Sequence, residues 1–106
     1  MAELVVTWTP FALRCLDEIH YFISEEAGSI HPADKFVEKI FTRTNQLTLF
    51  PESGQQEMFL IDRGVRSRYL VEGNYKIVYE YLEDKKIIVI IDVFHTDQNP
   101  QKILNR

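Results

Sequence analysis

The periodicity of the chain changes from helical to strand-like near Met58, and this change constrains the fold more than any other feature of the sequence. Before it, apolar residues recur at three- and four-residue steps in two stretches, which predicts two amphipathic helices. After it, three stretches rich in β-branched and aromatic residues, at 65–71, 75–82 and 86–94, have the pattern of strands. Short links separate these stretches, so we expect neighbouring strands to run antiparallel.

The two helices have recognisable ends. Thr9 can cap a first helix that starts at Pro10, and Gly28 can end it. The second helix is predicted at 31–50 and should stop before Pro51. Because the link between the helices is short, they should form an antiparallel pair.

An additional strand at 3–9 precedes the helices, which gives the order β-α-α-β-β-β. The predicted fold class is therefore α+β, with an antiparallel helical hairpin packed on one face of a mostly antiparallel four-stranded sheet. Residues 1–106 are expected to form a single domain with one core, and 51–56 to form a loop. The residues expected in that core include Trp8, Phe22, Phe36 and Phe41.

Two-residue loops at Gly73–Asn74 and Asp84–Lys85 would fix the strand register. The predicted partners are Arg68 with Tyr79, Arg66 with Tyr81, Ile77 with Asp92, and Tyr75 with Phe94. In that register one face carries Arg66, Arg68, Tyr75, Tyr79 and Asp92, and the other carries Lys76, Val93 and His95. The pattern leaves open which face the helices cover.

Composition excludes several classes of protein. The net charge of -4 argues against a general nucleic-acid-binding protein. No apolar stretch approaches the ~20 residues of a membrane helix, and the start of the chain lacks a signal-peptide pattern, so the protein is expected to be cytoplasmic. The single Cys15 permits no internal disulfide and is interpreted as a small buried hydrophobic residue. Neither a phosphate-binding glycine loop nor a zinc motif is present.

Four segments together resemble the RelE/ParE superfamily of toxins from bacterial type II toxin–antitoxin systems, also called plasmid-stabilisation proteins. They are WTPFALRCLDEI at 8–19, LFPESG at 49–54, GVRSRYLVEGNYKIVYEY at 64–81 and IIVIIDVFHTDQNP at 87–100. The resemblance covers nearly the whole chain, and the segments occur in the order that the family has.

The resemblance implies a toxin that a cognate antitoxin neutralises, with no cofactor and no metal. RelE-like members are ribosome-dependent mRNA endoribonucleases, and for that branch the catalytic candidates are Arg66, Arg68, Lys76 and His95. ParE-like members inhibit DNA gyrase, and the candidates for target binding are Arg66, Arg68, Tyr75, Tyr79, His95 and Asp97. Free toxin is also expected to be able to form a homodimer through its strand edges.

The residues favour the ParE-like branch. RNA cleavage needs an acid, a base and cations close together, whereas the predicted register separates Arg66 and Arg68 from Lys76 and His95. Asp97 stands where the family usually has arginine, which leaves open a degenerate member of low toxicity. For His95 the simpler interpretation is a polar residue at the end of a strand.

Overall fold

A computed structural model describes residues 3–56 and 67–97 of the chain. Its elements in chain order are β1 (Val5–Trp8), α1 (Pro10–Ala27), α2 (His31–Asn45), a 3₁₀ turn (Gln46–Thr48), β2 (Gln55–Gln56), β3 (Arg68–Glu72), β4 (Tyr75–Leu82), a second 3₁₀ turn (Glu83–Lys85) and β5 (Ile87–His95).

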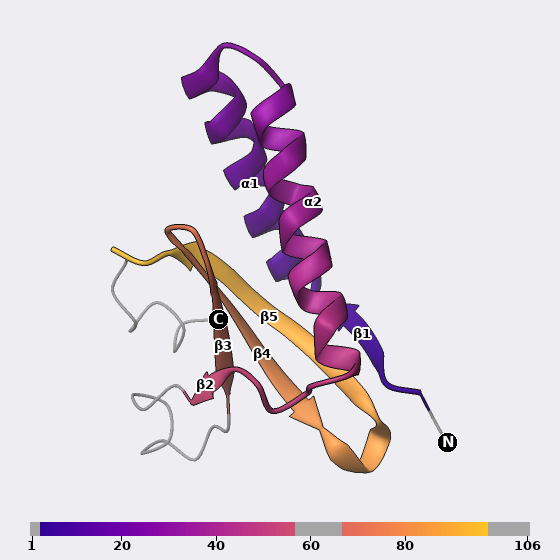
Figure 1. Cartoon of the computed structure of the whole chain (residues 1–106). Coiled ribbons are helices and arrows are strands. Elements are labelled where there is room, and N and C mark those ends of the chain that lie inside the picture. Colours follow the sequence, from indigo (N-terminus) through magenta and orange to yellow (C-terminus); the bar gives the residue numbers. More distant parts are fainter. Residues whose placement is uncertain (1–2, 57–66, 98–106) are drawn as a thin grey trace.

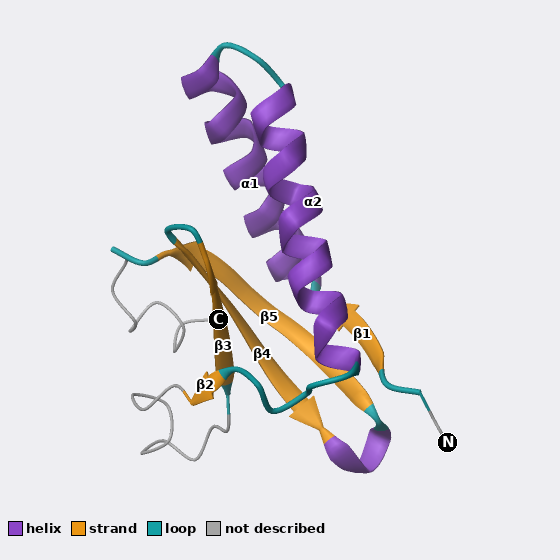
Figure 2. Cartoon of the chain, viewed as in Figure 1, coloured by secondary structure: helices purple, strands orange, loops and turns teal. Residues whose placement is uncertain are grey.

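The strands form one mixed sheet in the order β1-β5-β4-β3-β2. Strand β1 runs parallel to β5, and the other pairs are antiparallel. Both helices pack on one face of this sheet, and the far end of the helix pair projects beyond it (Figure 1, Figure 2). The predicted α+β class is confirmed, but the sheet has five strands, because Gln55 and Gln56 pair with β3 instead of lying in a loop.

The helix ends follow from the residues that stand there. The Thr9 hydroxyl accepts a hydrogen bond from the Ala12 N–H at 3.0 Å, and Gly28 ends α1 with a left-handed φ of 65°. Helix α2 has a proline in its first turn, as predicted. Its α-helical part ends at Asn45, earlier than predicted, because the chain tightens there into the 3₁₀ turn.

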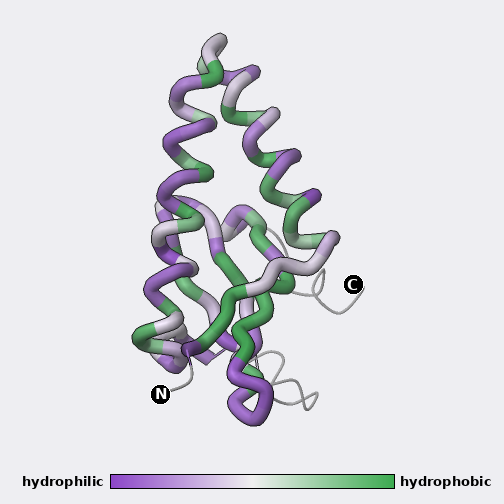
Figure 3. Tube along the Cα trace, turned by 90° about the vertical axis from the view of Figure 1, so that its right-hand side faces the viewer, coloured by the Kyte–Doolittle hydropathy of each residue, from purple (hydrophilic) through white to green (hydrophobic). Residues whose placement is uncertain are grey.

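The helices cover the face of the sheet that carries Leu70, Ile77, Tyr79, Ile88, Ile90 and Val93, which form the main core with Ala12, Leu16, Ile40 and Leu47. Figure 3 shows strands that are largely hydrophobic, whereas both helices alternate between hydrophilic and hydrophobic residues. Trp8 and Phe36 pack against this core as expected. Phe22 and Phe41 were wrongly predicted to be core residues, because they are 56% and 38% exposed, although the Phe41 ring still packs against Trp8 with centroids 5.2 Å apart.

The register prediction holds for most of the sheet. Strands β3 and β4 are joined by Gly73 and Asn74, with Gly73 at a φ of 60°, and Arg68 lies opposite Tyr79. Strands β4 and β5 follow the predicted register from the pair Leu82–Ile87 to the pair Tyr79–Ile90. The predicted pairing of Arg66 lies outside the described residues.

A β-bulge then shifts the register by one residue, with Ile91 as the extra residue. Ile77 pairs with Val93 and Tyr75 pairs with His95, so the predicted pairs with Asp92 and Phe94 were wrong. Because a shift of one residue exchanges the two faces of a strand, Val93 and His95 belong to the helix-covered face.

The bulge also sets the surroundings of Asp92, which is buried. Its Oδ1 lies 3.6 Å from the Sγ of Cys15 on α1, where the thiol can donate to the carboxylate. Cys15 is only partly buried, so it is less enclosed than the small core residue that was predicted.

Candidate functional site

The loop from Pro51 to Gly54 lies over the sheet and is fixed by the side chain of Tyr79. The Tyr79 hydroxyl donates to the carbonyl oxygen of Pro51 at 2.9 Å and accepts the N–H of Gly54 at 2.9 Å. Tyr79 is 0% exposed, so it is not available to contact another molecule in this conformation. Its role is to anchor the loop.

Glycine is required at position 54 because the loop approaches the sheet closely. A Cβ atom there would lie 2.6 Å from the Tyr79 hydroxyl and 2.9 Å from the carbonyl oxygen of Tyr69. Sequence reasoning included Gly54 only as part of a family segment. The signal that could have found it is a glycine three residues after a proline, just before an extended segment.

Arg68 holds the same loop from β3. Its Nη1 donates to the carbonyl oxygens of Glu52 at 3.1 Å and Gly54 at 2.9 Å, and its Nη2 lies 3.5 Å from the Glu52 carboxylate. Most of the hydrogen-bonding capacity of this guanidinium is therefore directed into the protein.

Burial raises the pKa of Tyr79 above its usual value, while the Gly54 N–H and Arg68 act in the opposite direction. The neutral phenol is the form that can both donate and accept, which is what the contacts with Pro51 and Gly54 require.

Tyr75, His95 and Asp97 form a second group near the turn between β3 and β4. The Tyr75 ring packs edge-on against His95, with centroids 5.2 Å apart. Burial raises the pKa of Tyr75. His95 Nδ1 accepts the backbone N–H of Asp97 at 3.2 Å and lies 3.6 Å from the Asp97 carboxylate. In the neutral ring this leaves the hydrogen on Nε2. The side chains of His95 and Asp97 are 37% and 89% exposed.

Lys76 is on the opposite face of the sheet, where its Nζ lies 4.2 Å from the centroid of the Tyr69 ring. The prediction that Lys76 and His95 share a face was therefore wrong, because the bulge moves His95 to the face of Arg68. Sharing that face does not bring Arg68 and His95 together. Their partners on β4, Tyr79 and Tyr75, are four residues apart, or roughly 13 Å along the strand.

The candidates thus occupy three separate places: Arg68 with Tyr79, Tyr75 with His95 and Asp97, and Lys76 beside Tyr69 on the far face. Arg66 lies outside the described residues. Within residues 3–56 and 67–97, no three histidine, cysteine or acidic side chains gather in a way that could hold a metal ion. In the same part of the chain no helix is long and apolar enough to cross a membrane.

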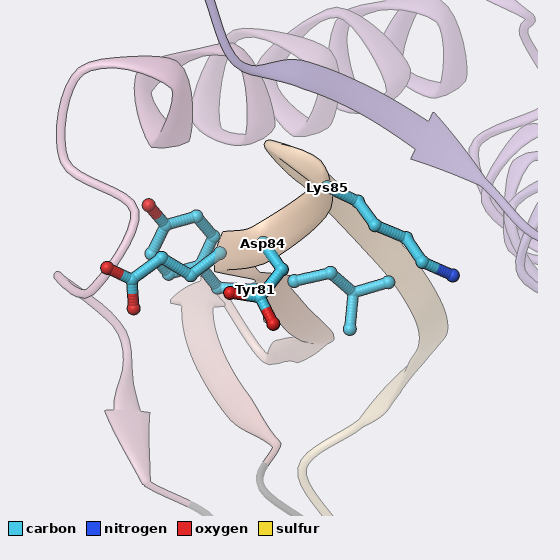
Figure 4. Close-up of a pocket in the computed structure, with 5 residues that line it drawn as sticks. Tyr81, Asp84 and Lys85 are labelled. Atoms are coloured by element: carbon cyan, nitrogen blue, oxygen red, sulfur yellow. The ribbon is translucent and has the colours of Figure 1, made fainter.

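A hollow of about 350 Å³ lies at the turn between β4 and β5, away from all of these residues (Figure 4). Its lining consists of Tyr81, Leu82, Glu83, Asp84 and Lys85. The side chains of Tyr81, Asp84 and Lys85 extend in different directions instead of toward a common point, so they do not form a binding site.

A helical pair on one face of a mixed sheet, with basic and aromatic side chains on the strands, is the arrangement that the resemblance to the RelE/ParE toxins implies. Residues 6–100 match the family described as "ParE toxin of type II toxin-antitoxin system, parDE", and the chain belongs to this family. Membership implies a cognate ParD antitoxin as a partner.

A solved structure described as "Chromosomal ParDE TA system from P. aeruginosa" is similar to this chain, with a TM-score of 0.68 and 22% sequence identity. The similarity covers 87% of this chain and 95% of that chain, and it shows a shared fold. No curated protein matches the sequence.

Proposed function

We propose that this ParE-family toxin acts in the cytoplasm by binding and inhibiting DNA gyrase, and that its cognate antitoxin prevents this binding. In this proposal the protein works as a binding module and carries out no chemistry of its own. The alternative within the superfamily is a ribosome-dependent mRNA endoribonuclease.

The separation of the candidate residues supports binding over catalysis more than any other observation. Cleavage of RNA by its 2′-hydroxyl requires a base, an acid and a cation for the phosphate within reach of one scissile bond. Arg68 is engaged by loop carbonyls, His95 lies roughly 13 Å further along the sheet, and Lys76 is on the other face. A single phosphate could not contact all three.

The charge of the chain agrees with this proposal. A nuclease that works among ribosomal phosphates benefits from a positive surface, whereas this chain has a net charge of -4.

The proposed contact residues divide into two kinds. His95 and Asp97 are accessible and are proposed to touch the target directly, with Tyr75 supporting the histidine ring. Arg68 and Tyr79 are proposed to act by holding loop 51–54 in place. Arg66 is retained as a proposed contact from its place in the sequence alone.

Two assays with the purified protein test the proposal. In the first assay, we expect the toxin to inhibit negative supercoiling of DNA by purified gyrase, and we expect added antitoxin to restore the supercoiling activity. In the second assay, we expect mRNA in translating ribosomes to stay intact. His95→Gln should weaken gyrase inhibition only a few-fold, in line with the loss of one surface contact. His31→Gln, a change at the exposed start of α2, is the matched control. Cleavage of mRNA that His95→Gln abolishes would overturn the proposal in favour of the endoribonuclease.

Asp97 supports one further candidate, a degenerate member that binds its antitoxin but harms no target. The family usually has arginine at this position, and the Asp97 carboxylate is 89% exposed, so it presents the opposite charge to any partner. Inactivity in both assays, together with intact antitoxin binding, would favour this candidate.

We also propose that the free toxin can pair with a second copy through β1. This strand lies at the edge of the sheet, and its exposed side is apolar at Val5. Sedimentation at several protein concentrations tests this, and a monomer at all of them would contradict it.

A further inference from the structure

Two adjoining hollows lie between α2 and the start of the turn that joins β3 to β4. Their volumes are about 340 Å³ and 280 Å³, and both are lined by Lys39 and Glu72, so they form one continuous groove. The turn lies at the end of the sheet toward which the helix pair projects (Figure 1). On the sheet side the groove is lined by residues 72–75 of the family segment 64–81, whereas its lining residues on α2 lie outside all four family segments.

Three basic residues, Lys35, Lys39 and Arg43, follow each other along the groove at four-residue steps, which places them on one side of α2. Arg43 is held by the sheet: its Nε lies 3.7 Å from the Glu72 carboxylate, and its Nη2 donates to the Val71 carbonyl oxygen at 3.4 Å. Within residues 3–56 and 67–97, neither Lys35 nor Lys39 makes an ion pair. The groove is therefore bordered by two lysines that make no ion pair with the described residues.

The groove also has an aromatic part. Phe36 and Tyr75 contribute to its lining and pack against each other with ring centroids 4.9 Å apart. Gly73, which forms part of the wall, has nothing within 4 Å of the place where its Cβ would be, so the turn leaves open space beside the rings. An apolar side chain could lie against these rings while negative groups pair with the lysines.

We propose that this groove binds an acidic, extended peptide segment that carries one aromatic or aliphatic residue, and that the antitoxin supplies the segment. From residue 35 to residue 43 the helix advances by about 12 Å, which corresponds to about four residues of extended chain. That the antitoxin supplies this segment rests on the proposed toxin–antitoxin function. That the groove binds an acidic peptide rests only on the residues that line it.

The lining favours a peptide over a nucleic acid. Glu38 and Glu72 line the same groove, and their carboxylates would repel a continuous row of phosphates. A peptide can place its carboxylates beside the lysines and keep an uncharged residue near the two glutamates.

Titration of the full chain with short synthetic peptides, followed by amide chemical shifts, tests the groove itself. The probe is a five-residue peptide with phenylalanine between two pairs of glutamates; its controls carry alanine for phenylalanine or lysine for glutamate. We expect shifts at Lys35, Phe36, Lys39 and Gly73, weaker binding of the alanine peptide, and no binding of the lysine peptide. Absence of binding, or shifts confined to other elements, would overturn the proposal.

The double variant Lys35→Gln/Lys39→Gln should bind the acidic peptide about tenfold more weakly, as expected for the loss of two partly exposed ion pairs. The matched control is Lys85→Gln/Lys86→Gln, which removes the same charge from the exposed turn between β4 and β5 and should leave binding unchanged. Equal losses in the two variants would show that only the overall charge matters and would refute a specific groove. Competition by a short RNA of equal charge would refute the preference for peptide.

The antitoxin is tested separately with the protein encoded beside this chain. Charge reversal by Lys35→Glu/Lys39→Glu should weaken the toxin–antitoxin complex at least about tenfold, while gyrase inhibition by free toxin stays intact. If the antitoxin binds this variant normally, the groove is not its docking site, although the proposed function stands. If the variant instead loses only self-association in sedimentation, the occupant is a second copy and the proposal is refuted.

Discussion

Replacing Tyr79 by phenylalanine would remove one hydroxyl group and nothing else from the centre of the molecule. That hydroxyl donates to the Pro51 carbonyl oxygen and accepts the Gly54 N–H, each at 2.9 Å. Phenylalanine has the same shape as tyrosine without its hydroxyl group, so the change creates almost no cavity. The experiment therefore isolates the two hydrogen bonds that hold loop 51–54 to β4.

The two partners lose different amounts of free energy. Gly54 is buried, so its N–H would be left without a partner, at a cost of about 1–3 kcal/mol. Pro51 is only half-buried, so water can replace the phenol at its carbonyl, and the net loss there is about 0.5–1 kcal/mol. We expect Tyr79→Phe to lower the free energy of unfolding by about 2–3 kcal/mol. For a chain of 106 residues this corresponds to a fall in melting temperature of about 10 °C.

Urea denaturation of the two proteins measures this difference, provided that the slope with denaturant is unchanged. Tyr69→Phe is the matched control, because its hydroxyl donates to the exposed Gln55 side chain at 3.0 Å and water can take its place. The control should change stability by no more than about 0.5 kcal/mol. Equal effects of the two substitutions would refute the claim that Tyr79 anchors the loop.

The stabilities of wild-type protein and Tyr79→Phe should also depend differently on pH. Burial raises the pKa of Tyr79 in the folded protein above the value near 10 of an unfolded chain, so its neutral form is favoured by folding. The stability that this group contributes is fully present below pH ~10 and is lost as the pH rises toward the folded-state pKa. Wild-type protein should lose stability in that range more steeply than Tyr79→Phe, and parallel pH profiles would contradict this.

Four further substitutions test contacts at Gly54, Arg68 and Asp97, with Gly28 as a control. Gly54→Ala should lower stability by about 2 kcal/mol or more in urea denaturation, because its Cβ would meet the Tyr79 hydroxyl at 2.6 Å. Gly28→Ala, which meets no atom within 4 Å, should cost only about 1 kcal/mol for its left-handed backbone. Arg68→Met should speed amide hydrogen exchange in loop 51–54 and lower stability by about 1–2 kcal/mol, because two bonds to loop carbonyls are lost. Asp97→Arg should increase growth inhibition on expression without antitoxin, and unchanged growth would show that this charge does not limit toxicity.

Most of the fold could be predicted because its signals are local. Thr9, Pro10 and Gly28 fix the ends of α1, and Gly73 with Asn74 fixes the register of β3 and β4. The two-residue strand β2 could not be predicted in this way. Gln55 and Gln56 have no strand pattern of their own, and they pair with β3 because Arg68 and Tyr79 hold the loop before them.

The arrangement of the candidate site could not be predicted, because it depends on one residue. Ile91 is a good strand residue in an apolar run, and nothing in its sequence context marks it as the extra residue of a bulge. The bulge exchanges the faces of the residues after it, so His95 lies beside Tyr75 instead of beside Lys76. The identities of the candidate residues could be predicted, but their grouping could not.

The way in which the bulge groups the candidate residues decides which of their side chains can contact a target. Arg68 and Tyr79 direct their polar groups at the protein's own loop, so contact with a target depends on groups that remain accessible beyond them. The His95 ring accepts the Asp97 N–H, which fixes the backbone just where the Asp97 carboxylate is exposed. A charge held in a fixed position discriminates between partners better than one on a mobile chain, because less entropy is lost on binding. The sign of the charge at position 97 should therefore affect the choice of partner more than any change at Arg68.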